Sequence, residues 1–315
     1  MTKGITRRRF IKGSAAVGAA ASFGGGIFAG SASGVETEET PAGLAVATGP
    51  DGWANTMAAV EADGGIAGIV PSGSKVAINA NTAFKHRGSI VAPGVLLAVL
   101  ELCAEAGASE VWLLKEAKDG FWERCDRAEK KRTVIDAARV SERDYEVVKI
   151  DRGLALKEAH VDRHWLTADV VLNVTLAKHH KGCGYTGALK NTMGACPHDP
   201  TCRFFHVGSK PDSEDWYPDM AHMSQCIADL NTIRKPDLTI LDAGEILLTN
   251  GPFGPGKLSR PGAVAAGVDM VALDAYGVRY LDLEPDAVPM IARAAALGIG
   301  NPDLSTVGIR EIALG

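Results

Sequence analysis

The stretch that decides the fold is Val170-Val171-Leu172-Asn173-Val174, followed after three residues by Lys178-His179-His180-Lys181-Gly182-Cys183-Gly184-Tyr185-Thr186-Gly187-Ala188-Leu189-Lys190-Asn191. The apolar run predicts a strand over residues 169–174 that is buried on both faces, as is typical of a parallel sheet. The loop after it gathers histidine, lysine, cysteine and glycine in a short space. Loops at the carboxyl ends of buried strands are where α/β proteins place binding and catalytic groups. This loop is therefore the first candidate for a functional site.

Strands alternate with helices along the rest of the chain. The patterns predict strands at 75–79, 110–114, 145–150, 169–174 and 237–242, and helices at 93–106, 127–139, 219–230, 269–280 and 289–297. Such alternation implies parallel strands joined by right-handed crossovers. We therefore expect an α/β fold of three layers, with a mostly parallel sheet and helices on both faces.

The first 34 residues have the composition of an export signal. The basic segment Thr6-Arg7-Arg8-Arg9-Phe10-Ile11-Lys12 precedes an Ala/Gly-rich run, and Ser31-Ala32-Ser33 offers a cleavage site. Paired arginines before a moderately apolar run resemble the twin-arginine signal, by which bacteria export folded proteins. The run is less apolar than the about 20 residues of a spanning helix. We therefore expect the twin-arginine export machinery as a partner, a periplasmic or otherwise exported protein, and no stable transmembrane anchor. An uncleaved anchor is the alternative.

The chain divides into three predicted parts: a twin-arginine signal peptide at 1–34, a linker or edge segment at 35–72, and a single α/β domain of one or two lobes at 73–315. With 46% hydrophobic and 23% charged residues, the composition is typical of a globular protein. The net charge is −5, and no long basic stripe follows the N-terminus. We therefore expect no nucleic-acid partner.

Four segments, at 75–108, 171–194, 236–256 and 266–275, together resemble one protein family. Its members typically show Asn-Val-Pro-Lys-Leu-Lys-Thr-His at a strand end, then Thr-Gly-Ala-x-Lys-Asn. Here these positions read Asn173-Val174-Thr175-Leu176-Ala177-Lys178-His179-His180 and Thr186-Gly187-Ala188-Leu189-Lys190-Asn191. Asn250-Gly251-Pro252 and the segment from Asp269 to Asp274 also match. The chain thus resembles the bacterial and archaeal domain-of-unknown-function family 362. Some relatives carry ferredoxin-like cysteine motifs for iron–sulfur clusters. The cysteines here lack that spacing, so we do not expect such a cluster.

A second resemblance is local to the same loop. The nickel-pincer lactate racemase family has a histidine, five residues, and then Ser-Gly-Gly-x-Lys. Here five residues separate His180 from Thr186-Gly187-Ala188-Leu189-Lys190. In that family the histidine acts as an acid or base beside a 2-hydroxy acid. The resemblance implies a related site architecture.

The side chains of the loop suit a small anionic ligand such as a carboxylate or a phosphate. His180 titrates near neutral pH and is the candidate acid/base. Lys178 and Lys190 flank it and are the candidate anion holders. Close approach of backbone N–H groups to a ligand is expected at Gly182, Gly184 and Gly187. A helix that starts near Thr186 would add partial positive charge. A packed loop with exposed lysines is the alternative reading.

Other polar residues follow predicted strands or stand at turns, and they complete the candidate binding set. Asp269 reads as a helix N-cap at least as well as a ligand. A basic loop after the first strand, with Arg87, should face the same sheet edge as His180. The further ligand-binding candidates are Asn79, Asn81, Arg87, Thr186, Asn191, Asp242, Asn250, Asp269 and Asp274.

A cysteine and histidine cluster follows the loop, and its members are candidate metal ligands: Cys183, Cys196, Cys202, His198 and His206. Thiolate and imidazole groups suit zinc, copper or iron. The spacing fits neither a zinc finger nor a ferredoxin. Export to an oxidising compartment favours a Cys196–Cys202 disulfide as the competing reading, and inert buried cysteines are a third.

Three functions therefore stay open. The first is an exported protein that binds a small anion, and that acts as an enzyme if His180 is an acid/base aided by a metal or organic cofactor. The second is a metal-binding or electron-transfer accessory protein, which would use Cys183, Cys196, Cys202 and His206. The third is a non-catalytic ligand-binding protein of the cell envelope. The sequence names neither the substrate nor the cofactor.

Overall fold

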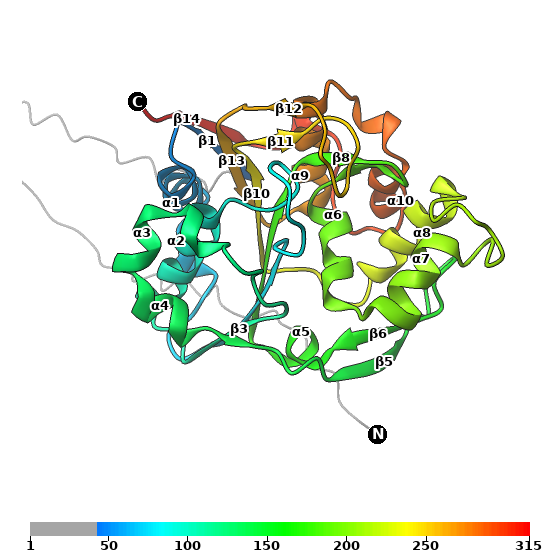
Figure 1. Cartoon of the computed structure of the whole chain (residues 1–315), viewed down its shortest axis with the longest axis horizontal. Coiled ribbons are helices and arrows are strands. Elements are labelled where there is room, and N and C mark those ends of the chain that lie inside the picture. The colour runs from blue at the N-terminus through cyan, green and yellow to red at the C-terminus, as the bar shows by residue number, and fades with distance from the viewer. Residues whose placement is uncertain (1–42) are drawn as a thin grey trace, which may run out of the picture. The chain divides into compact units, whose positions relative to one another are not determined.

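A large sheet forms the centre of the computed structural model, which describes residues 43–315 (Figure 1). The predicted signal peptide lies outside these residues. In sheet order the strands are β14 (Ile309–Ala313), β1 (Leu44–Thr48), β13 (Ala263–Gly267), β10 (Leu238–Ala243), β7 (Val170–Leu176), β2 (Lys75–Ala80), β3 (Glu110–Leu113) and β4 (Arg139–Val140). Strand β13 is antiparallel to both its neighbours, and every other pair is parallel. The sheet is mostly parallel, as predicted.

Helices cover both faces of the sheet and complete the predicted three layers (Figure 1). One face carries α1 (Gly52–Ala62), α2 (Pro93–Glu105), α3 (Asp126–Lys130) and α4 (Arg132–Ala137). The other carries α5 (Arg163–Thr167), α6 (Ala188–Asn191), α7 (Arg203–Val207), α8 (Met220–Leu230), α9 (Met270–Gly277) and α10 (Pro289–Ala296). Short helical turns lie at Ile66–Gly68, Trp122–Arg124, Thr192–Ala195, His198–Cys202, Val278–Leu281, Pro285–Ala287 and Leu304–Thr306.

Strand β7 separates two hydrophobic cores. Leu172 and Val174 belong to the core beneath α1 and α2, whereas Val171 belongs to the core beneath the second helix layer. Successive side chains of a strand alternate between its faces, so Asn173 and Thr175 point toward the second layer. Both side chains are buried, and both donate to backbone carbonyls at the start of α6. These polar positions are what bring α6 against the sheet.

The N-terminal region of the described chain is part of the sheet. Residues 35–72 were expected to be a linker or edge segment, but residues 44–48 form β1, one strand in from the edge. Asp51 then accepts a hydrogen bond from the backbone N–H of Trp53 and caps α1. Four of the five residues of β1 are buried, so this segment contributes to the core. The described residues 43–315 lie in one compact unit.

Two further elements differ from the predicted pattern. The expected strand at 145–150 is β5 (Tyr145–Lys149), which pairs with β6 (Glu158–Asp162) in a separate antiparallel sheet. The expected helix at 127–139 is interrupted at Lys131, whose backbone leaves the helical region. The Nζ of Lys131 lies 3.4 Å from a carboxylate oxygen of the buried Glu101 in α2. This ion pair accompanies the break between α3 and α4.

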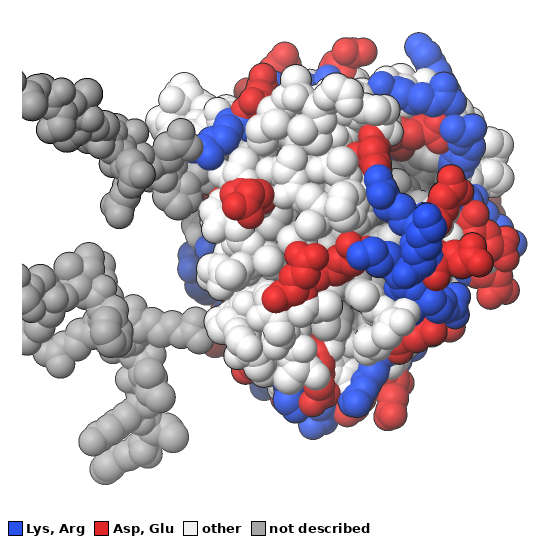
Figure 2. Space-filling view, turned by 90° about the vertical axis from the view of Figure 1, so that its left-hand side faces the viewer, with Lys and Arg blue, Asp and Glu red and all other residues white. Residues whose placement is uncertain are grey.

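The carboxyl ends of β2, β3, β7 and β10 meet at one edge of the sheet because these strands are parallel. The loops 81–92, 114–125, 177–187 and 244–262 therefore gather there, and Arg87 and His180 lie on the same edge, as expected. Two further hairpins occur in these loops: β8 (Lys178–His180) with β9 (Gly184–Thr186), and β11 (Ile246–Leu247) with β12 (Leu258–Ser259). On the face shown in Figure 2, charges of both signs intermix and gather at the right of the view.

Candidate functional site

A cavity of about 310 Å³ opens at this edge of the sheet, and we name it the His180 cavity. Its walls come from the ends of β2 and β3, the β8–β9 hairpin, α6, and the segments around residues 198–217 and 252–253. The lining residues are Asn79, Ala80, Asn81, Ala83, Phe84, Lys115, Lys178, His180, Thr186, Lys190, Asn191, Met193, Gly194, His198, Cys202, His206, Trp216, Tyr217, Pro252 and Phe253.

The β8–β9 hairpin explains why three of the polar groups face the cavity together. Its register pairs Lys178 with Thr186 and His180 with Gly184. Directly paired residues share a face, and residues two apart on a strand share that face too. Lys178, His180 and Thr186 therefore lie on one side of the hairpin. The Oγ1 atom of Thr186 is buried and has no hydrogen-bond partner.

Lys178 is fully buried at the start of the hairpin. Its Nζ donates to the carbonyl of Ser89 at 2.6 Å and lies 4.2 Å from the centre of the Phe84 ring. Burial, and then the charge of Lys190, lower the pKa of Lys178 well below 10.5. Removing a charged amino group from water is unfavourable unless an opposite charge compensates it, and no carboxylate pairs with Lys178 within residues 43–315.

Lys190 lies in α6 and is also buried. The one hydrogen-bond partner of its Nζ within the described chain is the sulfur of Met193, at 3.4 Å. Burial lowers the pKa of Lys190, and the nearby Cys183 and Cys202 oppose that effect. A thioether is a weak acceptor. The cavity thus contains two buried amino groups, and the described residues supply a carboxylate to neither.

His180 presents a hydrogen-bond donor to the cavity. Its Nδ1 accepts from the backbone N–H of Gly182 at 3.0 Å, so the neutral ring carries its proton on Nε2. Burial is the main cause that lowers the pKa of His180 well below 6.5, and Lys190 and Lys178 lower it further. The ring is therefore neutral at neutral pH. In this state Nε2–H can donate to a ligand oxygen, but it cannot accept a proton.

His206 presents the opposite tautomer. Its Nδ1 contacts the carbonyl oxygen of Cys202, and a carbonyl only accepts, so Nδ1 carries the proton and Nε2 is an acceptor. Burial is the main cause that lowers the pKa of His206 to about 4. Its ring stacks on Trp216, with centroids 5.1 Å apart. His206 was predicted as a metal ligand, whereas here it lines the same cavity as His180.

Three asparagines fix α6 against the sheet. Asn191 donates from Nδ2 to the Oδ1 of Asn173 at 2.7 Å, and Asn79 donates from Nδ2 to the carbonyl of Asn191 at 2.6 Å. All three side chains are buried. Asn79 and Asn191 were predicted to bind a ligand; they line the cavity, but their hydrogen bonds are internal. Asn81 lines it too, and its backbone pairs with Val174 and Val91.

The N-terminus of α6 is not available to a ligand, contrary to expectation. Asp274 accepts from the backbone N–H groups of Ala188 at 2.6 Å and Leu189 at 2.9 Å. Burial raises the pKa of Asp274 to about 7. Gly187 makes this contact possible, because a Cβ there would lie 2.1 Å from Oδ1 of Asp274. The predicted ligand residues Asp274 and Gly187 thus hold the helix in place.

Several other predicted ligand residues hold the fold and do not line the cavity. Asp242 accepts from the backbone N–H groups of Gly244 and of Ala92, the residue just before α2, and burial raises its pKa to about 6. Asp269 accepts from the backbone N–H groups of Val271 and Ala272 and caps α9, in agreement with the N-cap interpretation of the sequence.

Arg87 and Asn250 lie at the surface near the site. Arg87 is 65% exposed and forms two hydrogen bonds with Glu245. Asn250, with a φ of 56°, donates to the carbonyl of Pro255. Neither lines the His180 cavity.

Two glycines of the hairpin turn serve its shape. A Cβ at Gly182 would lie 2.3 Å from the Tyr217 ring, so its absence lets Tyr217 pack against the loop. The ring of Tyr217 meets His180 edge to face, with centroids 5.3 Å apart. Gly184 has a φ of 78°, in the region that favours glycine.

The predicted metal cluster is not assembled. Within residues 43–315, no group of three or more His, Cys, Asp or Glu side chains is placed to hold a metal ion. Cys183 donates to the carbonyl of Tyr185, and His198 is exposed beside Trp216. Cys196 and Cys202 are free thiols. Burial raises the pKa of both thiols.

Several residues that line the His180 cavity were not predicted from the sequence. Lys115 lies two residues after the end of β3, so the rule that pointed to the loops after β2 and β7 would also have found it. The aromatic walls Phe84, Trp216, Tyr217 and Phe253 show no local pattern. Phe84 and Phe253 meet edge to face at 5.1 Å from loops far apart in the sequence.

Residues 76–279 match the family described as Domain of unknown function (DUF362). The chain belongs to this family. Residues 4–24 match the twin-arginine translocation pathway signal sequence, so the protein is exported by the twin-arginine route. Within residues 43–315, we find no helix with the length and apolar character needed to cross a membrane.

Individual relatives are distant. A thylakoid-associated protein of Synechocystis sp. is 31% identical over 137 residues, which are 44% of this chain and 40% of that protein. The lactate racemase apoprotein from Thermoanaerobacterium thermosaccharolyticum is 9% identical, with a TM-score of 0.48 over 75% of this chain and 56% of that chain. A protein from Thermotoga maritima is 11% identical, with a TM-score of 0.40 over 62% and 51%. Because both scores are below 0.5, these likenesses are not evidence for a shared function.

Proposed function

We propose that this exported DUF362 protein binds a small organic anion in the His180 cavity. The observation that carries the proposal is the pair of buried amino groups of Lys178 and Lys190, for which the described chain provides no carboxylate. A carboxylate or phosphate in the cavity would compensate these charges. The unpartnered Oγ1 of Thr186 and the Nε2–H of His180 add hydrogen-bonding capacity for ligand oxygens.

Binding is tested by calorimetry with acetate, pyruvate and inorganic phosphate as probes. We expect the Lys190→Met variant to weaken binding of the best probe at least tenfold. Lys181 is the matched control, because it lies in the same loop but is 65% exposed and pairs with Asp215. Lys181→Met should leave affinity within twofold. Equal affinity of wild type and Lys190→Met would refute the proposal.

We further propose that the two histidines allow proton transfer on the bound anion. The unprotonated Nε2 of His206 would accept a carbon-bound proton next to a carbonyl group. The electron pair of that C–H bond would form an enolate, and the Nε2–H of His180 would stabilise its oxygen. In this step His180 is the hydrogen-bond donor to the enolate oxygen, and His206 is the general base. The same cavity is also compatible with a protein that binds the anion and carries out no proton transfer.

Exchange of the methyl protons of pyruvate for deuterium in D₂O tests the step, because pyruvate combines a carboxylate, a carbonyl and exchangeable C–H bonds. Proton NMR should show exchange above the buffer rate, and His206→Phe should reduce the enzymatic rate at least a hundredfold. Tight pyruvate binding without exchange would refute the catalytic step and leave the binding function standing.

A further inference from the structure

A second and larger cavity, of about 770 Å³, adjoins the His180 cavity, and we name it the basic cavity. It lies between the loops that follow β2 and β3. Ala83, Phe84 and Lys115 line both cavities, so the two are neighbours along the same edge of the sheet. Five cationic and two acidic residues line the basic cavity: Lys85, Lys115, Lys118, Arg124, Arg143, Glu116 and Asp119.

The five cations of the basic cavity share one property. None of them forms an ion pair with a carboxylate in the part of the chain that the structure describes. Some arginines elsewhere on the surface do: Arg127 pairs with Asp51, and Arg139 lies 3.5 Å from Glu110. Arg124 instead contacts the ring of Phe121. Positive charge is therefore concentrated in the basic cavity, although the whole chain has a net charge of −5.

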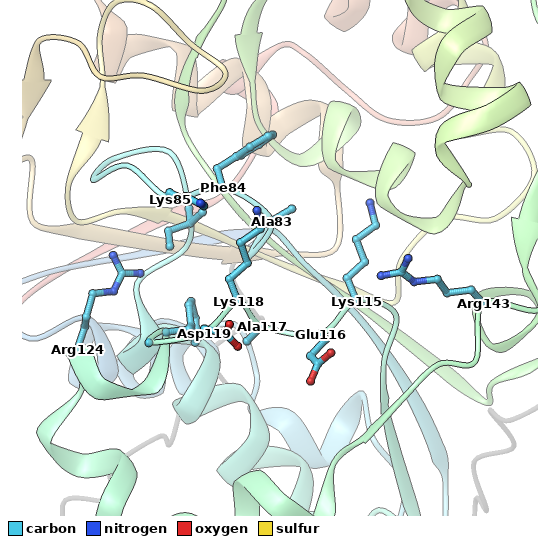
Figure 3. Close-up of a pocket in the computed structure, with 13 residues that line it drawn as sticks. Ala83, Phe84, Lys85, Lys115, Glu116, Ala117, Lys118, Asp119, Arg124 and Arg143 are labelled. Atoms are coloured by element: carbon cyan, nitrogen blue, oxygen red, sulfur yellow. The ribbon is translucent and has the colours of Figure 1, made fainter.

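The orientation of the cationic side chains in the basic cavity suits the binding of one anionic group. In Figure 3 the amino groups of Lys115 and Lys118 point to the same side, and the guanidinium of Arg143 points toward Lys115. The carboxylate of Glu116 points away from these three groups. A guanidinium with nearby ammonium groups is the usual protein environment of a phosphate.

The backbone conformation of Arg143 also supports a ligand-binding role for its side chain. Arg143 has a φ of 61°, in the left-handed region that bulky residues rarely adopt. The Oγ of Ser141 accepts from the backbone N–H of Arg143 and donates to Asp162. Strained residues of this kind cluster where a side chain must be presented to a ligand.

We infer that the basic cavity binds the phosphate group of a small molecule whose carboxylate end occupies the His180 cavity. This inference rests on the proposed function, and it narrows the ligand class to phosphorylated carboxylic acids. Lys115, shared by both cavities, lies between the two anionic ends. A single ligand with two charged ends uses both cavities at once, so its affinity exceeds that of either end alone.

Calorimetry with 3-phosphoglycerate, glycerate and inorganic phosphate tests the inference. We expect 3-phosphoglycerate to bind at least tenfold more tightly than either of the others. The double variant Arg143→Gln, Lys118→Gln changes only residues of the basic cavity, and it should remove this advantage while glycerate binding stays within twofold. Lys181→Gln is the control for charge removal alone, and circular dichroism confirms that each variant is folded.

The outcomes separate the two proposals. Binding of glycerate with no gain from its phosphate would overturn the two-ended ligand and leave the proposed function intact. Equally tight binding of inorganic phosphate would show a free-phosphate site and also overturn it. Phosphate-dependent binding that needs Arg143 but is indifferent to Lys190→Met would support the basic cavity and refute the His180 cavity. If none of the three probes binds, the two-ended ligand is refuted; if acetate and pyruvate do not bind either, the proposed function fails as well.

Discussion

Lys190→Met should make the unliganded protein more stable while it weakens anion binding at least tenfold. Lys190 is buried, and its Nζ has one hydrogen-bond partner in the described chain, the weak acceptor Sδ of Met193 at 3.4 Å. Methionine has a similar length and no charge, so it removes an uncompensated ammonium and leaves no large hole. Replacing a buried ion pair with apolar groups of similar volume is often neutral or stabilising by about 1–4 kcal/mol, and we expect the stabilising range for this uncompensated amino group. For a domain of this size that corresponds to a rise in Tm of roughly 2–8 °C.

The pH dependence of folding stability gives a second and independent test of the buried amino group of Lys190. The pKa of Lys190 is lowered in the folded protein from its ordinary value of 10.5. Between the two pKa values the unfolded chain binds a proton that the folded chain does not, so stability rises with pH in that window. Lys190→Met should show a smaller rise than wild type between pH 7 and 10.

The assay is urea unfolding, followed by circular dichroism, at a series of pH values in buffers free of carboxylate and phosphate. Lys181→Met provides the control, and its free energy of unfolding should stay within about 0.5 kcal/mol of wild type because the side chain is 65% exposed. A Lys190→Met variant less stable than wild type by 1 kcal/mol or more would refute the reasoning, since Lys190 would then have a stabilising partner.

Three further predictions concern other parts of the site. Because the pKa of His206 is lowered to about 4, the folded state loses stability as pH falls from 6.5 to 4. The free energy of unfolding of His206→Phe should therefore fall less than that of wild type over this pH range, as measured by acid unfolding. Asp274→Ala leaves two buried N–H groups without their acceptor, and it should lower stability by about 2–4 kcal/mol; the exposed Asp286→Ala should not, and a similar loss for both would contradict the argument. Cys196 and Cys202 are thiols here, so alkylation of the denatured, unreduced exported protein should modify all six cysteines; two unmodified sites at these positions would reveal the disulfide instead.

The sequence located the central strand and its loop because their signals are local. The run at 170–174 is continuously apolar, and the alternation of the hairpin puts Lys178 and His180 on one face. Twin-arginine and family motifs are also local. Each of these features can be recognised without knowing what the segment packs against.

The errors arise where a distant residue decides the outcome. The N-terminus of α6 was expected to face a ligand, but Asp274, 86 residues further along the chain, occupies it. Strand β5 has the composition of a sheet strand, yet it is mostly exposed and pairs with β6 in its own sheet. His206 was grouped with the cysteines by proximity in sequence; in the structure its Nδ1 contacts the carbonyl of Cys202, and its ring stacks on Trp216.

The attachment of α6 has a consequence for the speed of ligand capture. Asp274 holds its first turn, and the hydrogen bonds of Asn79 and Asn173 hold Asn191 at its end. Lys190 therefore occupies a rigid segment before any ligand arrives, and little side-chain freedom is left to lose on association. A site prepared in this way should capture its anion in a single kinetic phase whose rate grows linearly with ligand concentration. Stopped-flow traces that instead reach a plateau would indicate a slow rearrangement of the helix.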